Sequence, residues 1–111
     1  MKTEIQDYDN FTVVQLQGEF DGDFTETFQN IITEAVKEQK NGIILNMNKV
    51  KFIDSEGLER LLWAKDYCIE NDYFIKFAGL DENCRKILEM TRLENEFDCY
   101  SELDQAVKSF T

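Results

Sequence analysis

The chain has 111 residues, 42% of them hydrophobic, which is enough to enclose one core, and we expect a single domain over residues 1–111. Its net charge of −11, from 23 acidic and 12 basic residues, disfavours nucleic acids and anionic membranes as partners and suits a basic protein surface. Because histidine is absent and no Cys-x-x-Cys pair occurs, the composition excludes a structural zinc site and histidine-dependent nucleophilic catalysis.

The first half of the chain predicts a hairpin followed by an amphipathic helix. Residues 3–8 and 11–17 are strand-like and flank an Asp-Asn turn, so we expect two paired strands. Apolar residues then recur every three or four positions over 24–36, which predicts a helix. Asp23 or Thr25 is suited to cap its start, and an Asn-Gly pair ends it after residue 40.

The second half alternates strands with helices. Residues 43–47 form a short apolar run between turn signals, which is typical of a central strand covered on both faces. The remaining predicted elements are a helix at about 55–71, a strand at 73–78, a helix near 81–91, a short strand at 97–100 and a last helix from about 103 to 110.

The resulting element order is β-β-α-β-α-β-α-β-α. Strands that alternate with helices imply right-handed crossovers and a mostly parallel sheet, to which the opening hairpin adds an antiparallel edge. We therefore predict an α/β fold with a mixed, mostly parallel sheet of about five strands and about four helices. No stretch approaches the roughly 18 apolar residues of a membrane span, and the first residues lack a signal-peptide core, so we expect a soluble, cytoplasmic protein. The three cysteines (Cys68, Cys84 and Cys99) are predicted to be buried, reduced thiols.

One strand-to-helix turn stands out chemically. Asp54-Ser55-Glu56-Gly57 opens the second helix, where free backbone N–H groups and the helix dipole favour negative charge. Gly57 permits either a close approach of another backbone or a tight first turn. Ser55 also has a plain structural interpretation as the helix N-cap.

Residues 45–58, which contain this turn, resemble the signature of the STAS family, in which a buried strand ends in V-x-F-I-D and D-S-S/T-G-L opens a helix. Residues 18–21 (Gly-Glu-Phe-Asp) are similar to the family's G-E-L-D, and residues 88–93 to its L…TGL segment. The resemblance extends from about residue 5 to residue 110. It implies a STAS-like domain that acts as a bacterial anti-sigma factor antagonist in transcription regulation. Such a protein binds an anti-sigma factor with serine-kinase activity, frees a sigma factor, and is switched off by phosphorylation.

The chain departs from this pattern at Glu56. Relatives switched by phosphorylation usually carry the acceptor hydroxyl directly before the glycine, where this chain has Glu56. A serine kinase cannot phosphorylate a carboxylate, and one permanent charge imitates poorly the −1.5 to −2 of a phosphate. Three interpretations stay open: Glu56 holds the domain in a state like the phosphorylated one, regulation has moved to Ser55, or Glu56 is only a good first-turn residue in a domain without phospho-regulation.

Four further residues are candidates for partner binding. Asp21 matches the acid of the family's G-E-L-D, and its loop is expected at the same end of the sheet as Asp54; the alternative is a turn residue that bonds its own backbone two residues on. A helical wheel places Trp63 and Tyr67 opposite the core side of the second helix, near Arg60, as a partner or dimer contact would require. The alternative is that a neighbouring loop covers this side of the helix, or that the aromatic residues are exposed without a function.

We therefore predict a protein-binding regulator without catalytic residues, cofactor or metal. The expected partner is an anti-sigma factor with kinase activity, bound through the acidic turn and the exposed face of the second helix. The alternative is a STAS subunit of a lipid-transport or membrane ATPase complex. A homodimer, and a small ligand at the carboxyl ends of the parallel strands near Asp54, both stay open.

Overall fold

The core of the structure is a five-stranded sheet in the order β1-β2-β3-β4-β5, in a computed structural model that describes residues 1–111. β1 is antiparallel to β2, and every other neighbouring pair is parallel. The strands are β1 (Lys2–Asp7), β2 (Phe11–Phe20), β3 (Gly42–Ile53), β4 (Phe74–Ala78) and β5 (Cys99–Tyr100). The predicted fold class is confirmed, including the antiparallel edge made by the opening hairpin.

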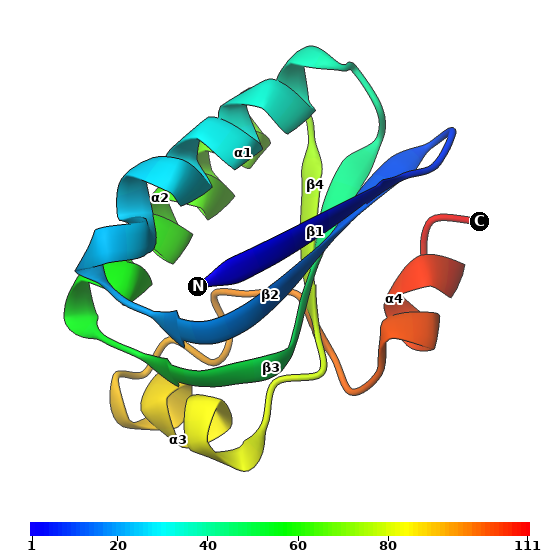
Figure 1. The fold of residues 1–111 in the computed structure, drawn as a ribbon. Helices are drawn as coiled ribbons and strands as arrows, with labels where there is room; N and C mark the ends of the chain where they lie inside the picture. Colours follow the sequence, from blue (N-terminus) through cyan, green and yellow to red (C-terminus); the bar gives the residue numbers. More distant parts are fainter.

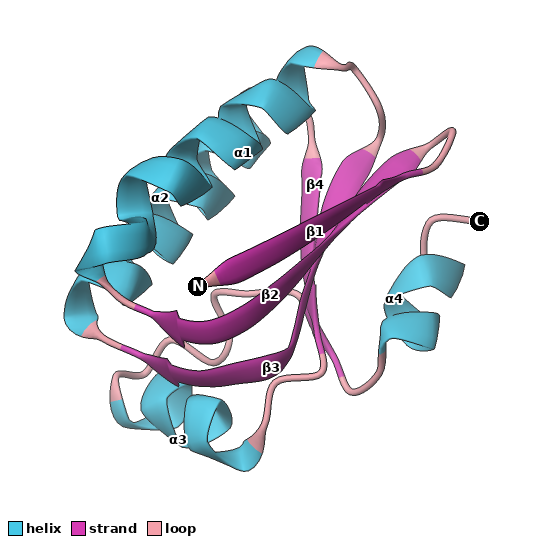
Figure 2. Ribbon diagram, in the orientation of Figure 1, coloured by secondary structure: helices cyan, strands magenta, loops and turns pink.

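The helices cover the two faces of this sheet unequally. They are α1 (Thr25–Lys37), α2 (Ser55–Glu70), α3 (Glu82–Met90) and α4 (Leu103–Lys108), with a short 3-10 turn, η1 (Gly22–Phe24), before α1. The first three pack on one face, whereas α4 alone lies against the other (Figures 1 and 2). None of the helices combines the length and the apolar character that crossing a bilayer needs.

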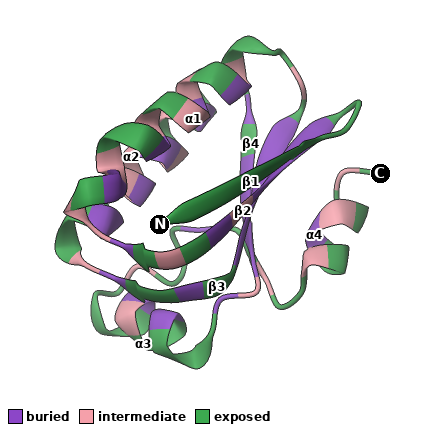
Figure 3. Cartoon of the chain, in the orientation of Figure 1, coloured by how far each residue is buried: buried purple, intermediate pink, exposed green.

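Burial follows this division. The face under α1, α2 and α3 holds a core cluster of 23 buried residues, and the face under α4 holds a cluster of five. Strand β3 serves both, because Ile43 and Leu45 belong to the large cluster and Ile44 to the small one. The buried positions concentrate between the sheet and the helices, and β1 is exposed along its whole length (Figure 3).

Several predicted element bounds were wrong. β3 continues to Ile53, six residues beyond its predicted end at Met47, and β2 continues to Phe20. The two strands stay paired through register shifts beyond the segment that helices cover on both faces, so the continuous apolar pattern ends before the strand does. In addition, α1 ends at Lys37 instead of residue 40, and β5 has two residues instead of four.

The cysteine prediction holds in part. Cys68 and Cys84 are buried, and burial raises the pKa of each thiol to about 12. Cys99 is exposed on β5, the edge strand of the sheet.

Candidate functional site

The turn that opens α2 is tied to the loop after β2 by one carboxylate. Asp54 caps α2: its Oδ1 accepts a hydrogen bond from the Gly57 N–H at 2.8 Å, and its Oδ2 accepts one from the Gly22 N–H at 3.3 Å. The Asp54 N–H in turn donates to the Phe20 carbonyl oxygen at 3.1 Å. The two loops, residues 21–23 and 54–57, therefore form one connected unit, which we call the acidic corner.

Gly57 allows this corner to close. It is buried, and a Cβ at this position would collide with the carbonyl oxygen and the ring of Phe20. Since the obstacle includes backbone at the end of β2, a side chain could fit only if α2 or β2 moved. The interpretation of Gly57 as a point of close backbone approach is confirmed.

The two residues between Asp54 and Gly57 point to solvent. Ser55 is exposed and its hydroxyl makes no hydrogen bond within the protein; the interpretation of Ser55 as N-cap is wrong, because the longer Asp54 side chain already fills that role. Glu56 is also exposed, and its carboxylate lies over Gly22, leaving no room there for a Cβ. Glu56 thus belongs to one loop of the acidic corner, and its carboxylate contacts the other.

Asp21 lies in the same corner, in the structural role that the sequence offered as an alternative. Its side chain accepts a hydrogen bond from the Asp23 N–H at 3.0 Å and caps the 3-10 turn η1. Asp21 is half-buried, and the adjacent Gly22 carries the bond to Asp54. No group of three or more acidic or sulfur side chains is placed to hold a metal ion.

The side of α2 that faces α1 carries the other predicted contact residues. The rings of Trp63 and Tyr67 stack with centroids 5.1 Å apart, and the Arg60 guanidinium lies 5.5 Å from the Trp63 ring centroid. Arg60 also donates a hydrogen bond to the Gln29 side chain on α1. All three predicted residues are half-buried, and the two aromatic rings pack against the large core cluster.

The two aromatic rings are therefore less exposed than a helical wheel of α2 alone implies, because they also pack against the large core cluster. Two residues that join the loops and helices around the site, Gly22 and Gln29, were not among those predicted from the sequence. The Asp-Gly pair after the Gly-Glu-Phe motif was the available signal for Gly22, while Gln29 had none, because its role depends on how the two helices pack.

Comparisons with known proteins agree with this architecture. A family model described as STAS domain matches residues 2–106. An anti-sigma factor antagonist from Mycobacterium paratuberculosis superposes with a TM-score of 0.84 at 22% identity, covering 98% of this chain and 92% of that one. The unphosphorylated anti-sigma factor antagonist SpoIIAA gives 0.80 at 18%, covering 97% and 95%. A sulfate transporter family protein from Wolinella succinogenes gives 0.81 at 16%, covering 90% and 84%. At these identities, likeness to the solved structures establishes the shared fold.

Proposed function

The chain belongs to the STAS domain family, and from that premise we propose that it is an anti-sigma factor antagonist that binds reversibly to an anti-sigma factor with serine-kinase activity. The observation that carries the proposal is the acidic corner. Asp54 bonds both loops, so Ser55 and Glu56 are presented to solvent from a backbone that is already fixed. A preorganised surface binds without paying for loop ordering.

Charge supports the same kind of partner. Asp21, Asp23, Asp54 and Glu56 gather in the acidic corner, on a chain of net charge −11. Potentials of one sign speed the encounter with a complementary surface and select against partners of like charge. The partner surface is therefore basic.

Glu56 supplies the corner with a permanent charge. It occupies the position directly before Gly57, where the family motif has a hydroxyl residue, and its carboxylate lies against Gly22 in the other loop. We infer that this charge takes part in docking and that any phosphate is received by Ser55. The Ser55 hydroxyl is exposed and unbonded, as a kinase substrate must be.

Phosphopeptide mapping tests the assignment to Ser55. The chain is incubated with the cognate kinase and ATP, and the modified residue is located by mass spectrometry. We expect phosphate on Ser55 and none in the Ser55→Ala variant. Phosphate at another residue would contradict the assignment, whereas a kinase that binds without phosphorylating would leave the docking proposal standing and remove the phospho-switch.

Affinity measurements test the docking role of Glu56. We expect Glu56→Ser to weaken kinase binding about tenfold, because it removes a charge from the centre of the proposed contact. Glu59→Ser is the matched control, since Glu59 is exposed on the same helix outside the acidic corner. Tighter binding by Glu56→Ser would instead favour the interpretation in which Glu56 mimics a phosphate.

A second candidate is a subunit of a transport complex. The fold likeness to a sulfate transporter family protein supports it, and Ser55 keeps a hydroxyl residue after Asp54. Affinity purification from cells that express a tagged chain distinguishes the two functions. Recovery of a kinase-like anti-sigma factor favours the first, and recovery of a transporter ATPase favours the second.

A further inference from the structure

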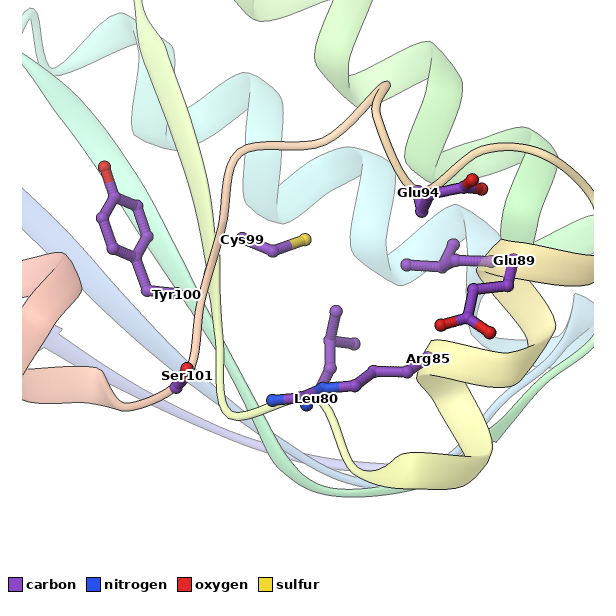
Figure 4. A pocket seen from close by; sticks show the side chains of 8 residues that line it. Leu80, Arg85, Glu89, Glu94, Cys99, Tyr100 and Ser101 are labelled. Atoms are coloured by element: carbon purple, nitrogen blue, oxygen red, sulfur yellow. The ribbon is translucent and has the colours of Figure 1, made fainter.

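A second feature lies at the carboxyl ends of β4 and β5, away from the acidic corner. It is a pocket of about 290 Å³ between α3 and the segment around β5 (Figure 4). Its floor is apolar, formed by the buried side chains of Leu80 and Leu88. We call it the charged pocket because Arg85, Glu89 and Glu94 stand at its rim. It shares no residue with the acidic corner.

The rim charges have no partners within the protein. The structure contains five ion pairs, and none involves Arg85, Glu89 or Glu94. The neighbouring Lys86 does pair, with Glu82 one turn earlier at 3.4 Å. Arg85 extends instead toward Leu80 and Ser101, away from the Glu89 carboxylate (Figure 4). The pocket is thus bordered by unpaired charges of both signs.

Two further groups suit a ligand of mixed character. The Ser101 hydroxyl stands at the Arg85 end and makes no hydrogen bond within the protein. Cys99 is an exposed residue, and its thiol points toward the pocket (Figure 4). Desolvation there, with the neighbouring Asp98 carboxylate, raises the pKa of the Cys99 thiol to about 11. The thiol is therefore neutral at pH 7 and extends the apolar floor.

We propose that the charged pocket binds a free α-amino acid with an apolar side chain. Its carboxylate would lie against Arg85 and Ser101, its ammonium against Glu89 and Glu94, and its side chain over the apolar floor. Arg85 and Glu89 lie one helical turn apart on α3, so their long side chains can reach the carboxylate and the ammonium of one ligand from the same helix.

Size and charge narrow the ligand class further. Small-molecule pockets commonly run from about 300 to 1,000 Å³, so this one is at the lower limit and admits an amino acid more readily than a nucleotide. A chain of net charge −11 repels simple anions, whereas a zwitterion brings its own positive charge to the two carboxylates. This site is independent of the proposed kinase binding.

Titration of the full chain, followed by the amide signals in ¹H–¹⁵N NMR spectra, tests the proposal. The probes are L-leucine, L-methionine and L-phenylalanine, with 4-methylpentanoate and 3-methylbutylamine as matched compounds that lack the amine or the carboxylate. We expect an amino acid to shift the amides of residues 85–89 and 99–101 saturably, and each matched compound to bind at least about tenfold more weakly. No saturable shift up to about 10 mM, or equal binding of a matched compound, would overturn the proposal.

A pair of neighbouring variants locates the binding. Arg85→Gln and Lys86→Gln each remove one positive charge from adjacent exposed positions of α3, but only Arg85 lines the pocket. We expect Arg85→Gln to weaken amino-acid binding about tenfold or more and Lys86→Gln to change it less than about twofold. If Arg85→Gln proves unfolded, Ser101→Ala replaces it with the same expected direction. Equal effects at both members of the pair would overturn the assignment.

Discussion

The acidic corner and the charged pocket each lie beside a helix with an aspartate N-cap, but the further bonds of the two aspartates differ. Each lies where a parallel strand gives way to a helix capped by an aspartate: Asp54 accepts from the Gly57 N–H at 2.8 Å, and Asp81 accepts from the Cys84 N–H at 2.8 Å. The second oxygen of Asp54 also bonds the neighbouring loop at Gly22, whereas the Asp81 side chain bonds only to Cys84 in its own helix. The same capping motif therefore ties α2 to a neighbouring loop at the acidic corner, whereas α3, which borders the charged pocket, has no such tie at its start.

The acidic corner and the charged pocket therefore suit different kinds of binding partner. The acidic corner is closed by hydrogen bonds and by backbone contact at Gly57, so its functional groups point outward, which suits a macromolecular partner. At the charged pocket, strand β5 has only two residues, and a hollow lies between it and α3. A concave site with unpaired charges suits a small ligand.

The substitution with the largest expected effect on stability adds a side chain inside the acidic corner. We expect Gly57→Ala to lower the free energy of unfolding by about 2–3 kcal/mol, since the added methyl group meets Phe20 backbone that cannot yield locally. Urea denaturation measures the loss. Partner binding should weaken together with stability, because the start of α2 must move.

Gly22→Ala is the matched control for that substitution. Its obstacle is the flexible end of the Glu56 side chain, which can rotate away, so we expect a loss below about 1 kcal/mol. Equal losses at Gly22 and Gly57 would mean that the corner is not closed by backbone contact.

The next largest loss of stability is expected at Trp63, which lies on α2. Trp63 is half-buried, packs against the large core cluster and stacks on Tyr67. Because full truncation of a buried Trp costs about 3–5 kcal/mol, we expect Trp63→Ala to lower the free energy of unfolding by about 2 kcal/mol. Loss of kinase affinity without loss of stability would mean that Trp63 acts only as a partner contact. Thermal and urea unfolding, run beside the binding assay, separate the two.

The two capping aspartates allow the corners to be compared directly. Asp54→Ala and Asp81→Ala each remove an N-cap, which costs typically about 1 kcal/mol. We expect Asp54→Ala to cost up to about 1 kcal/mol more, because it also removes the acceptor of the Gly22 N–H. Hydrogen exchange at the Gly22 amide should accelerate only in the Asp54 variant. Equal costs and unchanged exchange at Gly22 would show that the bond between the loops contributes nothing to stability.

The acidic corner could be predicted from the sequence better than the charged pocket. The order of strands and helices, the turn at residues 54–57 and the need for Gly57 could all be read from periodicity, turn residues and one motif. The bond from Asp54 to Gly22 joins residues 32 positions apart, and the contact of Arg60 with Gln29 depends on helix packing, so no local pattern encodes either. The charged pocket was not predicted for the same reason, since Arg85 and Ser101 come to line one pocket only when β5 pairs with β4.

The last prediction concerns the reactivity of a residue in the charged pocket, and it involves no change in the free energy of unfolding. If the Cys99 thiol points into the charged pocket, its raised pKa of about 11 keeps it protonated at neutral pH, and only the thiolate reacts with iodoacetamide. We expect the alkylation rate at Cys99 to rise about tenfold per pH unit from pH 8 to pH 10, whereas an ordinary thiol levels off above its pKa of about 8.5. Mass spectrometry separates Cys99 from the buried Cys68 and Cys84. A plateau near pH 9 would place the Cys99 thiol in open solvent, and the pocket would then lose part of its apolar floor.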